Sequence, residues 1–301
     1  MAECHLNKFI KAAAPYPHVF SPDLLKDRNI LITGGATGLG RSMAFKFGTL
    51  GASIGIMSRN ERRLSGTVDE LRKAGIKATY HVADVRNPDE IHNAADAIEN
   101  EIGEINALVN NAAGNFISPL EYLSPNAVDS ILDIVLHGTF YCTLELGKRW
   151  IARKKGATVL NIVTTYATTG SAYVAPSAAA KAGVLALTKS LAAEWAKYGI
   201  RHVAIAPGAF PTDGAWSRLA PTKDLSDRML ERIPFKRFGT HEELTDLATF
   251  LMSDGASFIN GEAVVIDGGE SIANAAQFGF LSGLSEDQWK AIREMTRNPK
   301  A

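Results

Sequence analysis

The sequence has few cysteines and no net charge. Its two cysteines, Cys4 and Cys142, exclude a disulfide framework and show no metal-binding or redox spacing. The 32 basic and 32 acidic residues cancel, so no net field would attract a nucleic acid or a membrane surface. No uninterrupted apolar run reaches the roughly 18 residues that a membrane-spanning helix needs. The seven histidines lack H-E-x-x-H spacing, so we predict no metal site.

Targeting signals are also missing. The first 27 residues lack the charged and then apolar layout of a secretion signal. They contain no arginine before Arg28, which weakens a transit-peptide interpretation. The chain ends at Ala301 without a Ser-Lys-Leu-type peroxisomal signal. These observations predict a cytoplasmic protein.

Short apolar runs that alternate with longer helical patterns are the main feature that is present. Several runs carry apolar residues on both faces, as expected for parallel strands that are covered by helices above and below. This alternation predicts an α/β protein with a single Rossmann-type, doubly wound parallel sheet and helices on both faces. The expected strands are 30–33, 53–57, 78–82, 107–109, 159–163, 202–206 and 263–266.

The domain organisation expected from this pattern is simple. We predict an N-terminal arm at 1–27, an NADP(H)-binding catalytic domain at 28–270 and a C-terminal extension with one helix at 271–301. Ser285 and Gln288 have the spacing of a capping box, which predicts that this helix begins there and runs to about Arg297. We expect it to pack on the body or on a neighbouring subunit.

A glycine cluster at 33–40 lies between the first strand and the first helix. Glycines there let the backbone approach a pyrophosphate, and the helix N-terminus favours its negative charge. A glycine cluster alone also occurs in ordinary turns, but this placement favours a dinucleotide site. The predicted cofactor-binding residues of the cluster are Gly34, Gly35, Thr37, Gly38, Leu39 and Gly40.

The end of the second strand indicates which dinucleotide is bound. An acidic residue there would bind a free ribose 2′-hydroxyl, whereas Ser58 and Arg59 suit a 2′-phosphate. We therefore predict NADP(H), although Arg59 could be an ordinary surface residue. Asp84, after the third strand, could bind the adenine amine or could cap the next helix.

Further polar residues and glycines follow the fourth and sixth strands, at the edge of the sheet where ligands bind in open α/β folds. Asn111 follows the fourth strand, within the run 110–114. Pro207, Gly208 and Phe210 follow the sixth strand, with Thr212 close behind. We predict that these residues contact the cofactor.

These motifs resemble the short-chain dehydrogenase/reductase family over about residues 25–270. The resemblance rests on 33–40, 110–114, Lys181, Pro207-Gly208 and the closing Asp267-Gly268-Gly269. A narrower similarity, to mitochondrial-type 2,4-dienoyl-CoA reductases, rests on 111–119, on Tyr166 with Ser177 and Lys181, and on 216–219. It covers nearly the whole chain. It implies a homotetramer and allows a mitochondrial address.

The sequence departs from the broad family pattern at two catalytic positions. The usual tyrosine, four residues before the lysine, is replaced by Ser177, and Tyr166 lies 15 residues before Lys181. The usual asparagine of the fourth helix falls at about Val135. The dienoyl-CoA reductase pattern implies that Tyr166 and Asn115 take over these roles. The role of His137, where that pattern commonly has asparagine, stays open.

The side chains themselves suit this chemistry. Ser177 and Lys181 share one face of a helix, and a nearby ammonium would make Tyr166 a better proton donor. Hydride transfer to a conjugated thioester leaves charge on its oxygen, which Tyr166 and Asn115 could stabilise. The resemblance implies that Lys181 also holds the nicotinamide ribose.

Each of these four catalytic predictions has a plainer alternative. Tyr166 could be a packed aromatic and Lys181 a surface lysine. Asn115 could be a left-handed turn residue, and Ser177 could simply start its helix. Tyr173 is a competing donor in the loop before that helix.

For an acyl-CoA substrate, the resemblance points to Arg86, Phe116, Ser124 and Arg218. The two arginines could bind CoA phosphates or could be surface salt-bridge partners. The leading hypothesis is NADPH-dependent reduction of 2,4-dienoyl-CoA to 3-enoyl-CoA in unsaturated fatty-acid degradation. One alternative is a carbonyl reductase acting on a ketoacyl thioester or another ketone, which the missing tyrosine at 177 disfavours. Another is a non-catalytic NADP(H) sensor.

Overall fold

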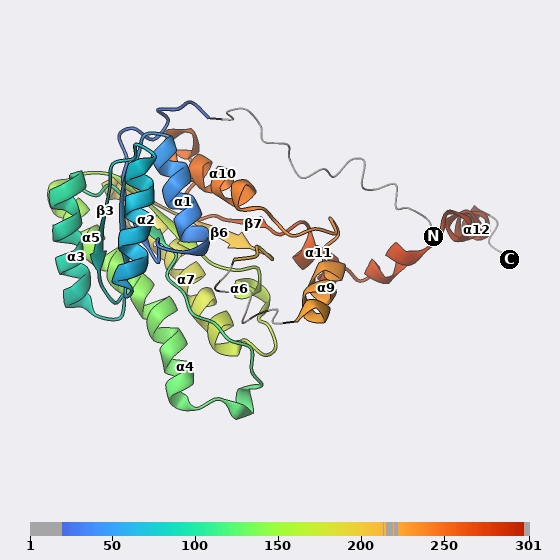
Figure 1. The fold of residues 1–301 in the computed structure, drawn as a ribbon. Coiled ribbons are helices and arrows are strands. Elements are labelled where there is room, and N and C mark those ends of the chain that lie inside the picture. The colour runs from blue at the N-terminus through green and yellow to red at the C-terminus, as the bar shows by residue number, and fades with distance from the viewer. Residues whose placement is uncertain (1–19, 213, 215–218, 220–221, 298–301) are drawn as a thin grey trace.

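A sheet of seven parallel strands forms the centre of the protein (Figure 1). The computed structural model describes residues 20–212, 214, 219 and 222–297. The strand order is β3-β2-β1-β4-β5-β6-β7, so the direction of winding reverses between β1 and β4. The strands are β1 (Asn29–Thr33), β2 (Ser53–Ser58), β3 (Ala78–Val82), β4 (Ala107–Asn110), β5 (Ala157–Ile162), β6 (Ile200–Pro207) and β7 (Ala263–Ile266). The predicted fold class and all seven predicted strands are confirmed.

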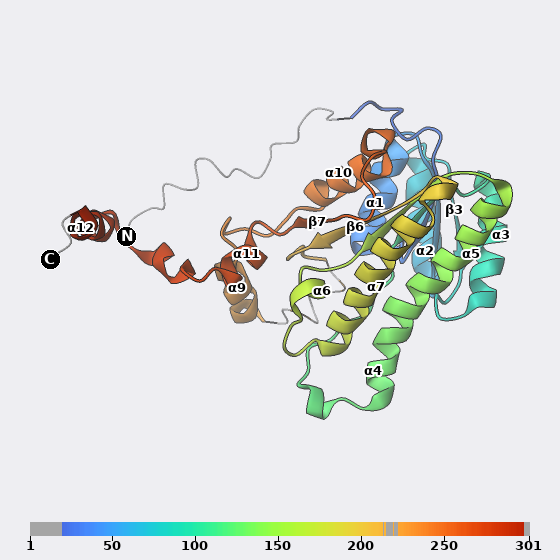
Figure 2. The same cartoon turned by 180° about the vertical axis from the view of Figure 1, so that it is seen from behind.

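Helices cover both faces of this sheet, as predicted. Figure 1 shows α1 and α2 in front of the sheet, and Figure 2 shows α5 and α7 in front of the opposite face. The helices are α1 (Gly38–Thr49), α2 (Glu61–Lys73), α3 (Pro88–Ile102), α4 (Pro125–Leu132), α5 (Gly138–Arg153), α6 (Tyr166–Thr169), α7 (Ala175–Glu194), α9 (Lys223–Arg232), α10 (His241–Met252), α11 (Glu270–Ala275) and α12 (Glu286–Arg297).

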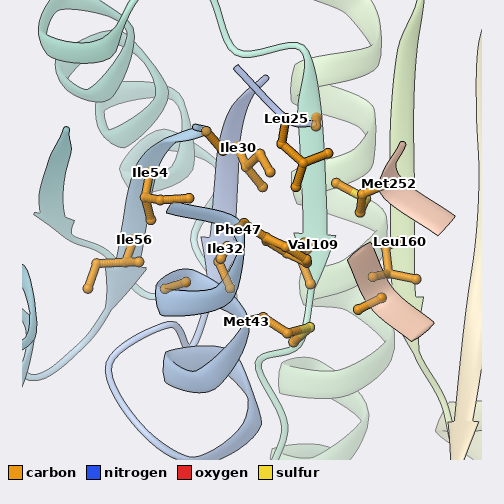
Figure 3. Packing of buried hydrophobic residues seen from close by; sticks show 14 of the residues in the cluster. Leu25, Ile30, Ile32, Met43, Phe47, Ile54, Ile56, Val109, Leu160 and Met252 are labelled. Carbon is orange, nitrogen blue, oxygen red and sulfur yellow. The ribbon is translucent and has the colours of Figure 1, made fainter. Parts of the chain in front are cut away.

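One hydrophobic core lies between the sheet and the layer of α1, α2 and α10 (Figure 3). Ile30 and Ile32 of β1 point into it, while Leu31 between them points to the other face. Met43 and Phe47 of α1, four residues apart, meet these strand residues. The alternation along the strand and the helical spacing determine which faces of β1 and α1 pack together. This packing holds the loop between β1 and α1 at the end of the sheet.

The second core contains α3 and α5. Cys142, Leu146 and Trp150 of α5 are buried there, and the Trp150 indole donates a 2.6 Å hydrogen bond to the Ile105 carbonyl. By length and composition alone, the helical segment Pro125–Arg153 could cross a membrane, although it has no uninterrupted apolar run of that length. The α5 part of this segment packs against α3, β4 and β5. A π-helical turn, Asp133–His137, joins α4 to α5 within this segment.

The two flanking segments differ in how they relate to the body. In the N-terminal arm, Leu25 is fully buried in the first core, and its amide donates to the Leu50 carbonyl. The C-terminal extension contains α11 besides the predicted helix, α12. The predicted capping box is confirmed, since Ser285 and Gln288 exchange hydrogen bonds of 2.8 and 3.3 Å. None of the residues 271–297 is buried, and α12 stands apart from the body (Figures 1 and 2).

Candidate active site

The predicted glycine cluster forms a tight loop that Asn111 fastens to the sheet. The Asn111 side-chain amide donates to the carbonyls of Thr33 (3.0 Å) and Gly34 (3.3 Å). Gly34 has a φ of +65°, and a Cβ at Gly40 would lie 2.5 Å from the Asn111 amide nitrogen. Only glycine fits these two positions. The loop leads into α1, whose N-terminus therefore faces the end of the sheet, as a pyrophosphate site requires.

Thr33 completes this arrangement. Its hydroxyl accepts hydrogen bonds from the backbone amides of Asn111 (3.0 Å) and Ala112 (2.9 Å). Asn111, predicted as a cofactor contact, thus holds the glycine loop in place. Thr37 is the N-cap residue of α1 in an extended conformation, and its side chain makes no capping hydrogen bond. Leu39 packs against the first core.

Arg59, Asp84 and Arg86 form a charged cluster after β2 and β3. Asp84 binds the Arg86 guanidinium through both carboxylate oxygens, at 2.6 to 3.0 Å. Hydrogen bonding from Arg86 holds the pKa of Asp84 below its ordinary value, so the group is a carboxylate. Arg59 is 62% exposed, with its guanidinium 4.0 Å from Asp84. The Glu90 carboxylate also reaches this cluster, where it accepts from the Asp84 amide at 2.8 Å, so the two arginines stand against two carboxylates.

The contacts of this cluster decide between two pairs of alternatives that the sequence left open, one for Asp84 and one for Arg86. The N-cap of α3 is Asn87, whose side chain accepts from the amides of Asp89 and Glu90, so the capping role for Asp84 is wrong. Arg86 is a salt-bridge partner, as one interpretation expected.

The residues at the end of β6 and just after it present mainly backbone groups to the predicted cofactor site. Pro207 is the last residue of β6, and the Gly208 amide donates to the Ile266 carbonyl of β7 at 2.9 Å. Phe210 is buried in the first core against Gly239, so only its backbone is available to a cofactor.

Tyr166, Asn115 and Ser177 are brought together at one point. Tyr166 opens α6, just past the end of β5. The Asn115 side-chain amide donates to the Tyr166 hydroxyl at 3.3 Å, and the Ser177 hydroxyl lies 3.2 Å from it on α7. A hydroxyl and an amide this close can both donate to one acceptor oxygen. Two such donors are what an oxyanion site requires.

The plainer alternatives for these residues differ in outcome. Asn115 has no positive φ, so the left-handed turn is wrong. Ser177 lies in the first turn of α7, as the alternative of a helix-starting residue expects, although the N-cap is Val174. Tyr173 does have a φ of +66°, but its side chain is 61% exposed. Its carbonyl accepts from the Ser118 amide and so joins two loops beside the site.

Lys181 is buried beneath these residues, so a surface lysine is excluded. It lies one turn after Ser177, and its ammonium donates to the Ile162 carbonyl at the end of β5. Burial lowers its pKa to about 8, because a desolvated ammonium is less stable than a neutral amine.

A buried network of polar side chains supports the site from below, and sequence reasoning missed most of it. The Asn110 amide donates to Thr143 (3.0 Å) and to Asn161 (2.9 Å), and Asn161 donates to Thr188 (2.8 Å). The network ties β4 and β5 to α5 and α7. Two asparagines within otherwise apolar strands were the available signal.

The predicted substrate residues are less closely grouped. Phe116 packs against buried residues of α4 and α7. Its backbone amide donates a hydrogen bond to the Asn115 side-chain oxygen at 2.9 Å. Ser124 is the N-cap of α4. Arg218 lies outside the described residues. His137 pairs with Asp133 at 2.8 Å on the π-helical turn and is half exposed. Within the described part of the chain, no cluster of His, Cys, Asp and Glu could hold a metal ion.

Comparison with known proteins places this geometry in context. Residues 34–271 match the family model described as enoyl-(acyl carrier protein) reductase. A probable 2,4-dienoyl-CoA reductase of Caenorhabditis elegans, named as (3E)-enoyl-CoA-producing, is 43% identical over 91% of this chain and 90% of its own. A probable 2,4-dienoyl-CoA reductase of Bacillus subtilis, named as (2E)-enoyl-CoA-producing, is 40% identical over 82% of this chain and 97% of its own.

Solved structures agree with these relatives. A short-chain dehydrogenase from Bacillus anthracis is 42% identical and superimposes with a TM-score of 0.75, over 82% of this chain and 97% of its own. A gluconate 5-dehydrogenase from Burkholderia cenocepacia, solved with NADP and tartrate, is 32% identical with a TM-score of 0.78, over 83% of this chain and 98% of its own.

Proposed function

Because this chain belongs to the short-chain dehydrogenase/reductase family and is an oxidoreductase, we propose that it reduces 2,4-dienoyl-CoA thioesters to 3-enoyl-CoA with NADPH. The observation that carries the proposal is the position of the phenol. Tyr166 approaches from the end of β5, and a serine stands where the family's usual tyrosine would be. A serine hydroxyl is too weak an acid to protonate a carbonyl product near neutral pH. The donor at this point is therefore the Tyr166 phenol, displaced toward β5, which suits an acceptor oxygen that lies between Tyr166 and Asn115.

The thioester oxygen of a dienoyl-CoA is such an acceptor. When hydride adds at C5, the electron pair moves through the conjugated bonds to this oxygen and forms a dienolate. Tyr166 and Asn115 would each donate a hydrogen bond to it, which lowers the barrier because the charge is greatest in the transition state. Return of the electron pair and protonation at C2 give the 3-enoyl product. Water is a candidate donor of that proton.

The residues present fit a nicotinamide dinucleotide. The glycine loop folds tightly, since a Cβ at Gly40 would collide with Asn111 and the Gly34 carbonyl, and the N-terminus of α1 can face the pyrophosphate. Lys181 would bind the nicotinamide ribose, and the backbone after Pro207 would line the nicotinamide end. Asp84, with its carboxylate held by Arg86, could still accept from the adenine amine. When bound, the cofactor supplies the hydride.

The choice of NADPH over NADH rests on Arg59. Its guanidinium is exposed at the end of β2, the neighbour of β1 and its glycine loop, and its contact with Asp84 is a loose one of 4.0 Å, so it would be available to pair with a 2′-phosphate. We expect Arg59→Ala to weaken NADPH binding by about 10- to 100-fold, the loss typical of a hydrogen bond to a charged group. NADH affinity should change little. Fluorescence titration with both nucleotides measures this.

Lys73→Ala is a suitable control for Arg59→Ala. Lys73 is exposed at the other end of α2, and its replacement by alanine removes the same charge from the protein. Equal losses for NADPH and NADH in Arg59→Ala, or an equal loss of NADPH in the control, would contradict the cofactor assignment.

An acyl-CoA also needs groups for its long nucleotide tail. We propose that Arg86 and Arg218 bind its phosphates and that Phe116 and Ser124 border the acyl part. Arg86 is 41% exposed and offers one face to solvent while it pairs with Asp84. Guanidinium groups fit phosphate oxygens well.

One assay tests the proposed activity directly. Oxidation of NADPH should be rapid with a hexadienoyl-CoA and slow with acetoacetyl-CoA, because only the first places a conjugated thioester oxygen between Tyr166 and Asn115. Product analysis should show a double bond at C3. Preferred reduction of acetoacetyl-CoA would support a carbonyl reductase, and binding of NADPH without turnover of either would support a sensor.

We further propose that the protein is a homo-oligomer, a tetramer by resemblance. The support is the exposed apolar surface of the C-terminal extension, which includes Phe278, Phe280 (77% exposed) and Trp289. An exposed apolar segment of this kind is typical of an interface. The molar mass from light scattering tests the proposal. The predicted cytoplasmic location stays a prediction.

A further inference from the structure

His241 connects two segments that lie far apart in the sequence. It is the first residue of α10, after the N-cap Thr240. Its ring nitrogen Nδ1 lies 2.7 Å from the Ser42 hydroxyl on α1, and Nε2 lies 2.8 Å from the Pro211 carbonyl oxygen. Nothing in the chemistry proposed above uses this side chain.

The partners decide where the ring protons lie. A carbonyl oxygen can only accept, so Nε2 carries a hydrogen and donates to Pro211. In the neutral ring Nδ1 then accepts from the Ser42 hydroxyl. In the protonated ring Nδ1 donates to Ser42, whose own proton can go to the Gly38 carbonyl 3.2 Å away. The connection between Ser42 and Pro211 persists in both states.

The two connected segments form two walls of the predicted cofactor site: the glycine loop with the start of α1, where the pyrophosphate is expected, and the segment after β6, which is predicted to contact the cofactor. Ser42 lies in the first turn and a half of α1, directly behind Gly38 of the glycine loop. Pro211 and Thr212 belong to the segment that follows β6. The walls are in contact, since a Cβ at Gly38 would lie 3.3 Å from the Thr212 side chain.

We propose that His241 is a positioning residue that fixes the spacing between these walls and thereby the fit of the cofactor's pyrophosphate. The proposal rests on the proposed function only in assuming a nicotinamide dinucleotide. It concerns the part of the cofactor that NADPH and NADH share, so it predicts the same effect on both. Arg59, in contrast, should affect NADPH alone.

The test is nucleotide binding without any acyl-CoA. His241→Ala removes both hydrogen bonds, and we expect the Kd for NADPH and for NADH to rise by about 10-fold each. In a separate turnover assay with hexadienoyl-CoA, the kcat at saturating NADPH should stay near the wild-type value. His241→Gln keeps a donor near the position of Nε2, and His241→Asn keeps a polar group near Nδ1. Each should recover part of the affinity.

Asp246→Asn is the matched control. Asp246 of α10 pairs with Lys46 of α1 at 2.6 Å, so it joins the same two helices away from the glycine loop. We expect this variant to lower the melting temperature and leave both Kd values unchanged. Wild-type affinity in His241→Ala, or an equal loss in Asp246→Asn, would overturn the positioning role alone. A wild-type protein that binds neither nucleotide would overturn the proposed function as well.

Discussion

Replacing Tyr166 with phenylalanine should lower kcat for a dienoyl-CoA by about 100- to 1,000-fold, the loss typical of one oxyanion donor. The substitution removes only the hydroxyl that lies between Asn115 and Ser177. The Kd for NADPH should stay nearly unchanged, because the predicted cofactor contacts come from other segments. Stopped-flow or steady-state oxidation of NADPH measures the first quantity, and fluorescence titration measures the second.

Tyr173→Phe provides the comparison for this experiment. Tyr173 is also a tyrosine beside the site, but it is largely exposed and contacts Ser118 through its backbone. Its variant should turn over at close to the wild-type rate. A normal kcat in Tyr166→Phe, or a comparable loss in Tyr173→Phe, would remove Tyr166 from the mechanism.

The burial of Lys181 should make the free energy of unfolding depend on pH. Its pKa in the folded chain is about 8, against an ordinary value of 10.5. Between these values the unfolded chain holds a proton that the folded chain has released, so stability rises with pH from about 8 to 10.5. Below about 8 the full cost of burying the ammonium is present. The wild type should therefore gain about 3 kcal/mol across this window from this one group.

Lys181→Met removes that group, and the variant should lack this gain. Urea unfolding of the cofactor-free protein at pH 7.5 and pH 10 compares the two, and about 2.5 kcal/mol of the gain should fall within this interval. The same variant should lose at least about 100-fold in turnover, because it loses the cation beside the oxyanion site. Lys189→Met, at an exposed position of the same helix, should change neither quantity. Identical pH dependence in wild type and Lys181→Met would contradict the burial argument.

The fold was predictable because its signals are local and repeated. The strand β1 carries three successive apolar residues, Ile30 to Ile32, that are buried on both faces, as expected where helices cover both sides of a sheet. The grouping of Tyr166 with Ser177 was also predictable. Tyr166 follows the carboxyl end of β5, and Ser177 lies in the first turn of α7, where the chain returns to the same end of the sheet.

Contacts that depend on loop conformation were not predictable in the same way. Asp84 and Arg86 were assigned to different ligands, yet a turn places them against each other. Phe210 was predicted at the cofactor, but its side chain fills the core because Gly239 leaves room for the ring. His241 has no motif, and its two partners lie 30 and 199 residues away. Such pairs follow from tertiary packing, which a local pattern does not contain.

The hydrogen bonds from Asn111 and to Thr33 have a thermodynamic consequence for any nucleotide that enters the site. They restrict the glycine loop before a ligand arrives, so association would sacrifice little conformational entropy there. Flexible glycine-rich segments otherwise lose more freedom than any others when they become ordered. In this protein the glycine loop already loses this conformational freedom during folding. Its attraction for the phosphates of a nucleotide would therefore contribute almost fully to the binding affinity.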